Sequence, residues 1–137
     1  MEDLSLYRKV GAYLKLLKAE TRKKLGNVEE IGIYPCEYKS NNTLPERSLF
    51  IPYDSNGTWG NGWDSHAWFC FRVAAHPEQN ANPMILRVAS NLTGWDADNP
   101  QFLAYVDGEL RQGMDTNHTE LLLDSSCSHE IYIYAYT

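Results

Sequence analysis

Long hydrophobic runs and paired cysteines are both missing from this sequence. No apolar stretch among its 137 residues approaches the length that crosses a bilayer, and its first residues include Glu2 and Asp3, the wrong charge for a secretion signal. The three cysteines (Cys36, Cys70 and Cys127) are odd in number and have no C-x-x-C spacing, which argues against a disulfide framework and against a zinc site. We therefore expect a protein of the reducing cytoplasm.

Clusters of basic residues on a strand are missing too. The formal net charge is −6 at pH 7, and an acidic chain of this kind is a poor partner for nucleic acids and for anionic membranes. Its one basic run, Arg22 to Lys24, lies at the end of a predicted helix, where cations are favoured. We interpret this run as a solvated helix end, and contact with nucleic acid is the alternative.

The sequence also lacks the common catalytic motifs. It contains neither Gly-x-Ser-x-Gly nor the phosphate-binding pattern Gly-x-x-x-x-Gly-Lys-[Ser/Thr]. Asp115 and His118 have the spacing of a metal-binding pair, but no third ligand accompanies them, so we expect structural hydrogen bonds. Asp96, Asp98 and Asp115 are candidate carboxylates for glycoside hydrolysis, yet Asx turns explain loop aspartates more simply. We predict no catalytic residue, no bound metal and no cofactor in this chain.

What the sequence does contain is the composition of one globular domain, with 43% hydrophobic and 22% charged residues. Residues 3–25 have the period of an amphipathic helix, and Gly26 provides a stop. The helix has one apolar stripe, formed by Tyr7, Val10, Leu14 and Leu17. Two roles are open for it: docking on its own domain, or acting as an arm that packs on another domain or subunit. We assign residues 1–26 to this helical segment.

From residue 27 onward, apolar residues alternate with polar ones, as in strands with one buried face. The first strand is marked by Ile31, Ile33, Tyr34 and Tyr38, and residues 40–64 are polar and turn-rich. Further strands are expected at 66–75, 84–89, 101–113 (a hairpin), 120–123 and 130–136. Short strands separated by turns predict a mainly β protein: an antiparallel β-sandwich over residues 27–137, preceded by the N-terminal amphipathic α-helix.

Three of the four tryptophans lie in loops rather than in strands. Trp59, Trp63 and Trp95 have Gly, Asn and Asp as their neighbours. A tryptophan in such a place anchors the domain against another domain, offers a platform for a ligand ring, or fills the core from a loop. The residues alone therefore favour a binding or accessory domain and leave these three roles open.

The stretch 94–118 combines a hairpin with polar flanks. Residues 102–106 alternate toward Asp107-Gly108, a dipeptide that suits the positive φ angles of a two-residue turn. Such a turn brings both flanks to one end of the sandwich: Trp95 and Asp96 on one side, Asp115, Asn117 and His118 on the other. Asp and Asn side chains in loops hydrogen-bond the backbone. We interpret this end either as a docking face or as internal bracing.

A family resemblance runs through residues 57–123. The segments GTWGNGWDSHAWFCFRV (57–73) and NLTGWDADNPQFLAYVDGELRQGMDTNHTELLL (91–123) resemble the N-terminal, non-catalytic domain of bacterial α-mannosidases of glycoside hydrolase family 38. The matching positions are Trp59, Gly60, His66 to Phe69, Gly94 to Ala97, Asn99 to Leu103, Tyr105, Asp107, Gly108, Gln112, Gly113, Asp115, Asn117 and His118.

The resemblance implies a jelly-roll-like, galactose-binding-like β-sandwich placed before a larger catalytic domain. That domain would follow residue 137, hold one divalent metal, usually zinc, and use an Asp nucleophile for retaining hydrolysis of α-mannosides. Its metal signature G-H-x-H-I-D does not occur in this chain, and neither does an R-x-D segment for the nucleophile, so no catalytic residue carries over.

The implied partners are the catalytic domain of the same polypeptide, α-mannoside sugars, and further subunits of a homo-oligomeric parent enzyme. A rival from another class is a free-standing carbohydrate-binding module that uses Trp59, Trp63 and Trp95 as stacking platforms. The way the gene continues past Thr137 distinguishes the two, because only the mannosidase requires a downstream metal-binding motif.

Overall fold

The computed structural model describes residues 4–38, 43–60, 62, 64–80, 82–90 and 101–137. Within these residues one α-helix, α1 (Leu4–Thr21), precedes eight strands, and two short 3₁₀ helices lie at Arg47–Leu49 and Pro77–Gln79. The strands are β1 (Gly32–Cys36), β2 (Ile51–Pro52), β3 (His66–Val73), β4 (Met84–Arg87), β5 (Gln101–Val106), β6 (Glu109–Met114), β7 (Glu120–Leu123) and β8 (His129–Tyr136).

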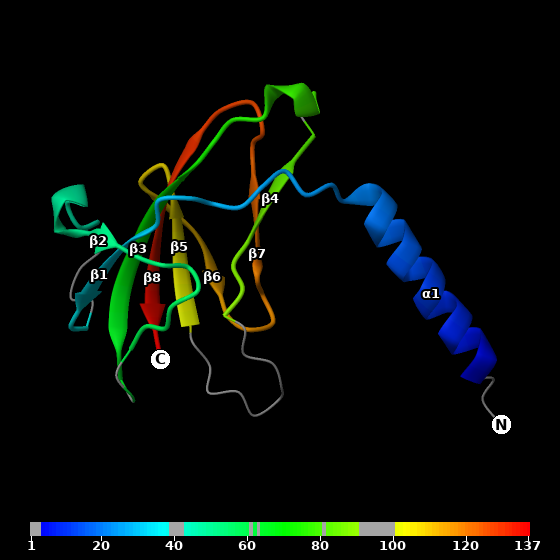
Figure 1. Ribbon diagram of the computed structural model, residues 1–137, viewed down its shortest axis with the longest axis horizontal. Coiled ribbons are helices and arrows are strands. Elements are labelled where there is room, and N and C mark those ends of the chain that lie inside the picture. Colours follow the sequence, from blue (N-terminus) through cyan, green and yellow to red (C-terminus); the bar gives the residue numbers. More distant parts are fainter. Residues whose placement is uncertain (1–3, 39–42, 61, 63, 81, 91–100) are drawn as a thin grey trace.

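The strands form two antiparallel sheets. Six strands pair in the order β2-β1-β3-β8-β5-β6, and β4 pairs with β7 in a small second sheet (Figure 1). The predicted mainly β architecture with one N-terminal helix is therefore confirmed. Its description as jelly-roll-like and galactose-binding-like stays a prediction.

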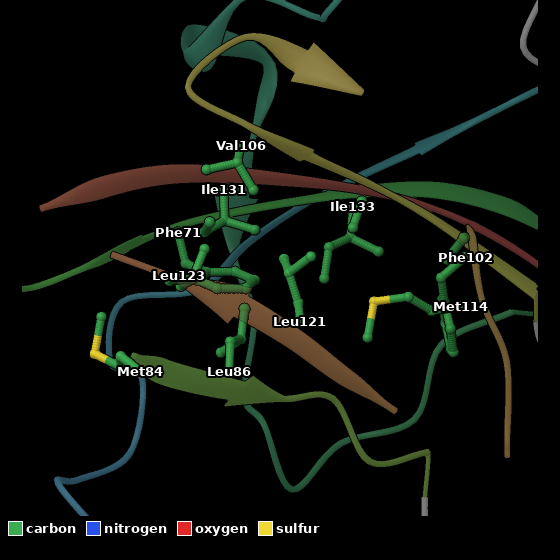
Figure 2. Close-up of a cluster of buried hydrophobic side chains, with 12 residues drawn as sticks. Phe71, Met84, Leu86, Phe102, Val106, Met114, Leu121, Leu123, Ile131 and Ile133 are labelled. Carbon is green, nitrogen blue, oxygen red and sulfur yellow. The ribbon is translucent and has the colours of Figure 1, made fainter. Parts of the chain in front are cut away.

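The main core lies between the two sheets (Figure 2). Because side chains alternate along a strand, β8 sends Ile131 and Ile133 toward the small sheet, while Leu121 and Leu123 of β7 point back at them. The Gln112 Nε2–H donates to the carbonyl oxygen of Glu120 over 3.0 Å, which ties β6 to β7 where the two sheets meet. The alternation of apolar and polar residues in the sequence thus reflects which face of each strand points into this core.

The opposite face of the large sheet is also buried, and it is aromatic. Trp68, Tyr105, Tyr132 and Tyr134 are each less than 8% exposed. Residues of the segment before β2, including Leu44 and Phe50, pack against them, and an ion pair between Arg47 and Glu130 (3.0 Å) fastens this segment to β8. Much of the tyrosine content is therefore structural.

Helix α1 ends four residues earlier than the period predicts. Its last residue, Thr21, hydrogen-bonds the Leu17 carbonyl oxygen over 2.8 Å, and Gly26 does not act as the stop. Leu25, Val28 and Ile31 pack against the main core outside any helix. These three side chains are partly buried, so each contributes part of the about 1.5–3 kcal/mol that full burial of an aliphatic side chain provides, and this packing favours ending the helix before them.

Candidate functional site

The predicted hairpin is present, and it organises the candidate site. Asp107 (φ 51°) and Gly108 (φ 89°) form a two-residue turn between β5 and β6, and Phe102 pairs with Met114 at the other end. Residues 115–118, which follow β6, lie at this open end of the hairpin, as the sequence predicts.

Asp115 organises the loop at that end. Its Oδ1 accepts hydrogen bonds from the backbone N–H groups of Asn117 and His118, both over 2.7 Å, and lies 3.0 Å from His118 Nδ1. The hydrogen bond from the His118 side chain, followed by those from the two backbone N–H groups, holds the pKa of Asp115 below its usual value. These contacts brace the loop after β6, and the docking interpretation of this end stays a prediction. The loop presents the exposed side chains of Asn117 and His118 outward.

Of the three loop tryptophans, Trp59 lies within the described residues. Trp59 is half-buried against the main core, with its ring centroid 5.7 Å from that of Phe69 in an edge-on contact. Filling the core from a loop is therefore part of its role. Trp63, Trp95 and Asp96 lie outside the described residues.

Replacing Asp115 by Ala should lower the melting temperature of the chain by more than Asp115→Asn does. Alanine removes the acceptor of both backbone N–H groups, whereas asparagine keeps one side-chain oxygen in its place. Differential scanning calorimetry of the two variants makes the comparison. Equal melting temperatures for wild type, Asp115→Ala and Asp115→Asn would show that the turn does not depend on this side chain.

Sequence reasoning missed a second polar network, at the turn end of the hairpin. His129 at the start of β8 is only 6% exposed; its Nδ1 lies 2.7 Å from Asp107 Oδ2 and its Nε2 lies 2.8 Å from the Asp124 carbonyl oxygen. The other Asp107 oxygen, Oδ1, accepts from the Glu130 backbone N–H over 2.9 Å. Both ring nitrogens face acceptors, which is the arrangement that a doubly protonated imidazolium requires.

The network shifts the pKa of both partners. Burial pulls the pKa of His129 down, but the hydrogen bonds to Asp107 and to the Asp124 carbonyl and the nearby negative charges together outweigh it and raise the pKa. The hydrogen bond from His129 and then that from the Glu130 backbone lower the pKa of Asp107. Cys127 Sγ lies 3.6 Å from His129 Nε2. That nitrogen already donates to Asp124, so the geometry does not make His129 a base for the thiol.

A third histidine with a structural role is His66, at the start of β3. Its Nδ1 shares a 2.6 Å hydrogen bond with the Tyr134 hydroxyl, and its Nε2 lies 3.1 Å from Asp64 Oδ1. The ring packs against Tyr134 and Tyr136 at centroid separations of 5.8 and 5.0 Å. This contact fixes the end of the large sheet where β3 and β8 lie side by side.

Within the described ranges, no three His, Cys, Asp or Glu side chains gather in a way that could hold a metal ion. No helix in the part of the chain that the structure describes combines the length and the apolar character needed to cross a bilayer. Comparison with protein-family models, with curated proteins and with solved structures found no match to this chain.

Proposed function

We propose that this chain is the non-catalytic, N-terminal accessory domain of an α-mannosidase of the glycoside hydrolase family 38 type. The observation that carries the proposal is that three residues of the family resemblance make contacts that stabilise the fold. His66 bonds Tyr134, Asp107 turns the hairpin and binds His129, and Asp115 braces the loop after β6. These side chains stabilise the sandwich, which is what a signature of a structural domain would encode.

Of the three candidate carboxylates, Asp96 and Asp98 lie outside the described residues, and Asp115 accepts backbone hydrogen bonds in its own loop, which supports a structural role for it in the proposal. A retaining glycosidase needs two carboxyl groups about 5–5.5 Å apart. Asp107 lies at the turn of the hairpin and Asp115 lies beyond its open end, so a strand of six residues separates them. At about 3.4 Å per residue this is roughly 20 Å. In the proposal, the nucleophile and the zinc ion both belong to a catalytic domain after residue 137.

The loop end of the sandwich is the docking face in this proposal. The Asp115 turn is rigid because its backbone N–H groups are bonded, and it holds the exposed Asn117 and His118 outward. A rigid loop with exposed polar side chains can meet another domain without paying much ordering entropy. Cytoplasmic location is part of the proposal, and the free thiols of Cys36, Cys70 and Cys127 are consistent with a reducing compartment.

The isolated chain should not hydrolyse aryl α-mannosides, with or without added zinc, and millimolar mannose or mannobiose should leave its tryptophan fluorescence unchanged. The first result is expected because the proposal places nucleophile and metal elsewhere, and the second because the loop face meets protein. Saturable quenching by mannobiose would favour the carbohydrate-binding module instead. Turnover that a single substitution in this chain abolishes would overturn the proposal.

A further inference from the structure

Positive and negative charges are segregated along this chain. Residues 4–24 contain seven of the 12 Lys and Arg residues and one acid, Glu20, which gives this segment a formal charge of +6, and Glu2 and Asp3 before it contribute −2. Residues 25–137 contain the other five cations and 15 of the 18 acids, which gives −10. The helix and the residues just after it are therefore a cationic arm on an anionic body.

The arm also exposes a continuous apolar stripe. Six large apolar side chains of α1 lie within one third of its circumference, at spacings of three and four, and each is 48–67% exposed: Leu6, Tyr7, Val10, Tyr13, Leu14 and Leu17. The cations Arg8, Lys9, Lys15 and Lys18 lie outside this sector. In Figure 1 the helix stands away from both sheets, so the described part of its own domain does not cover the stripe. A helix of this length owes its stability to packing of such a face.

The root of the arm, where residues 22–25 join it to the body, is fixed beside the small sheet. Arg22 forms an ion pair with Glu120 of β7 (2.6 Å), and Leu25 packs against the main core. Two residues along β7 on the same solvent face, Leu122 is 65% exposed and pairs with Ile85 of β4, which is 41% exposed. The root of the arm and the apolar pair Ile85–Leu122 are thus neighbours on the surface of one copy.

We propose that α1 of one copy packs on the solvent face of the β4–β7 sheet of a second copy, and that the exchange is reciprocal. A twofold axis close to the root would bring each arm over the other copy's Ile85–Leu122 pair, which is the isologous arrangement of most homodimers. The root-proximal part of the stripe, Tyr13, Leu14 and Leu17, would meet that pair. This inference does not depend on the proposed mannosidase function.

Charge selects the second copy over two other occupants. An arm at +6 is attracted to a body at −10, whereas pairing of two arms through their stripes would bring two +6 segments together. An anionic lipid surface attracts the arm but repels the body attached to it. In the reciprocal exchange the root-proximal part of the stripe (Tyr13, Leu14 and Leu17) and the Ile85–Leu122 pair are each used twice. These ten partly exposed apolar side chains are on the scale of the roughly 1,000 Å² that a specific interface needs.

Sedimentation equilibrium of the 137-residue chain tests the proposal, and the helix provides a matched control. Leu17 is 60% exposed within the stripe, and Leu16 is 61% exposed outside it. Wild type and Leu16→Glu should sediment as dimers at about 50 µM. Leu17→Glu should raise the dissociation constant by about 100-fold or more, because it buries a charge at the interface. Glutamate is a good helix former, so circular dichroism should show the same helix content in both variants.

A second pair of variants tests the solvent face of the β4–β7 sheet. Leu122→Glu should dissociate the dimer, whereas Leu110→Glu on β6, at a site 56% exposed in wild type, should leave it intact. A wild-type chain that is monomeric at 50 µM would overturn the inference, including the case in which it instead binds vesicles of phosphatidylserine. A dimer sensitive to Leu17→Glu but not to Leu122→Glu would mean that the arms pair with each other, and would also overturn it.

Discussion

Replacing Trp68 by Ala should lower the free energy of unfolding by about 3–5 kcal/mol, the usual loss for a buried aromatic side chain. Trp68 is 4% exposed in the middle of the aromatic face of the large sheet. Its ring centroid lies 5.2 Å from that of Tyr134 and 5.5 Å from that of Tyr105, so its removal leaves a cavity between neighbouring strands. Because domains of this size have only about 5–15 kcal/mol of stability, the variant should unfold at markedly lower urea concentration.

Two controls accompany this variant. Trp68→Phe keeps an aromatic ring in the site and should lose less than Trp68→Ala. Trp59→Ala should also lose less, because Trp59 is only half-buried at the edge of the main core. A loss below about 1 kcal/mol for Trp68→Ala, which is typical of surface positions, would contradict the conclusion that this aromatic face is a second core.

Replacing His129 by Gln should cost about 2 kcal/mol at pH 5.5 and clearly less at pH 8. The variant loses charge-assisted hydrogen bonds to Asp107 Oδ2 and to the Asp124 carbonyl oxygen in a site where the side chain is 7% exposed. Glutamine reaches only part of this geometry and carries no charge. Two neighbouring elements, the hairpin turn and the start of β8, are therefore loosened together.

The pH dependence follows from the directions of the two pKa shifts. The pKa of His129 is raised by folding, so its contribution is complete below the unfolded-state pKa of about 6.5 and is lost as the pH rises through the folded-state pKa. The pKa of Asp107 is lowered by folding, so its contribution is present above about pH 3.9 and is lost as the pH falls through the folded-state value. The difference between wild type and variant should be largest between about pH 4.5 and 6.

Urea unfolding of wild type and His129→Gln at pH 5.5 and pH 8 measures this difference directly. Taking the difference cancels every contribution that is the same in wild type and variant. If the variant loses the same free energy at both pH values, folding does not raise the pKa of His129, and a larger loss at pH 8 than at pH 5.5 would mean that the folded protein holds the ring neutral. Either result would contradict the assignment of an imidazolium between Asp107 and Asp124.

Local chemistry made the strands and the hairpin predictable. The strand expected at residues 120–123 corresponds to β7 (Glu120–Leu123), and the Asp107-Gly108 dipeptide corresponds to the observed turn. Both features depend on residues that are adjacent in the chain. The end of α1 was predicted less well, because the packing of Leu25, Val28 and Ile31 on the main core decides it. The spacing of apolar residues within the helix contains no information about such long-range contacts.

Contacts between distant residues were not accessible in the same way. Asp107 and His129 are 22 residues apart, and only the register between β5 and β8, in which Val106 pairs with Ile131, brings them together. The aromatic second core likewise requires the register that places Trp68 opposite Tyr134. A single sequence gives the faces of each strand but not the register of pairing between strands. For the candidate site, the Asp115–His118 pair was predictable because its members are three residues apart.

Activity of the native polypeptide that carries these 137 residues tests the proposed function most directly. Antibodies raised against the chain can capture that polypeptide from the cells that make it, and its mass and its activity on an aryl α-mannoside can then be measured. We predict a polypeptide far larger than 15.7 kDa that hydrolyses the substrate, loses activity on chelation of divalent metals and regains it with zinc. Capture of an inactive 15.7 kDa chain alone would contradict the mannosidase proposal.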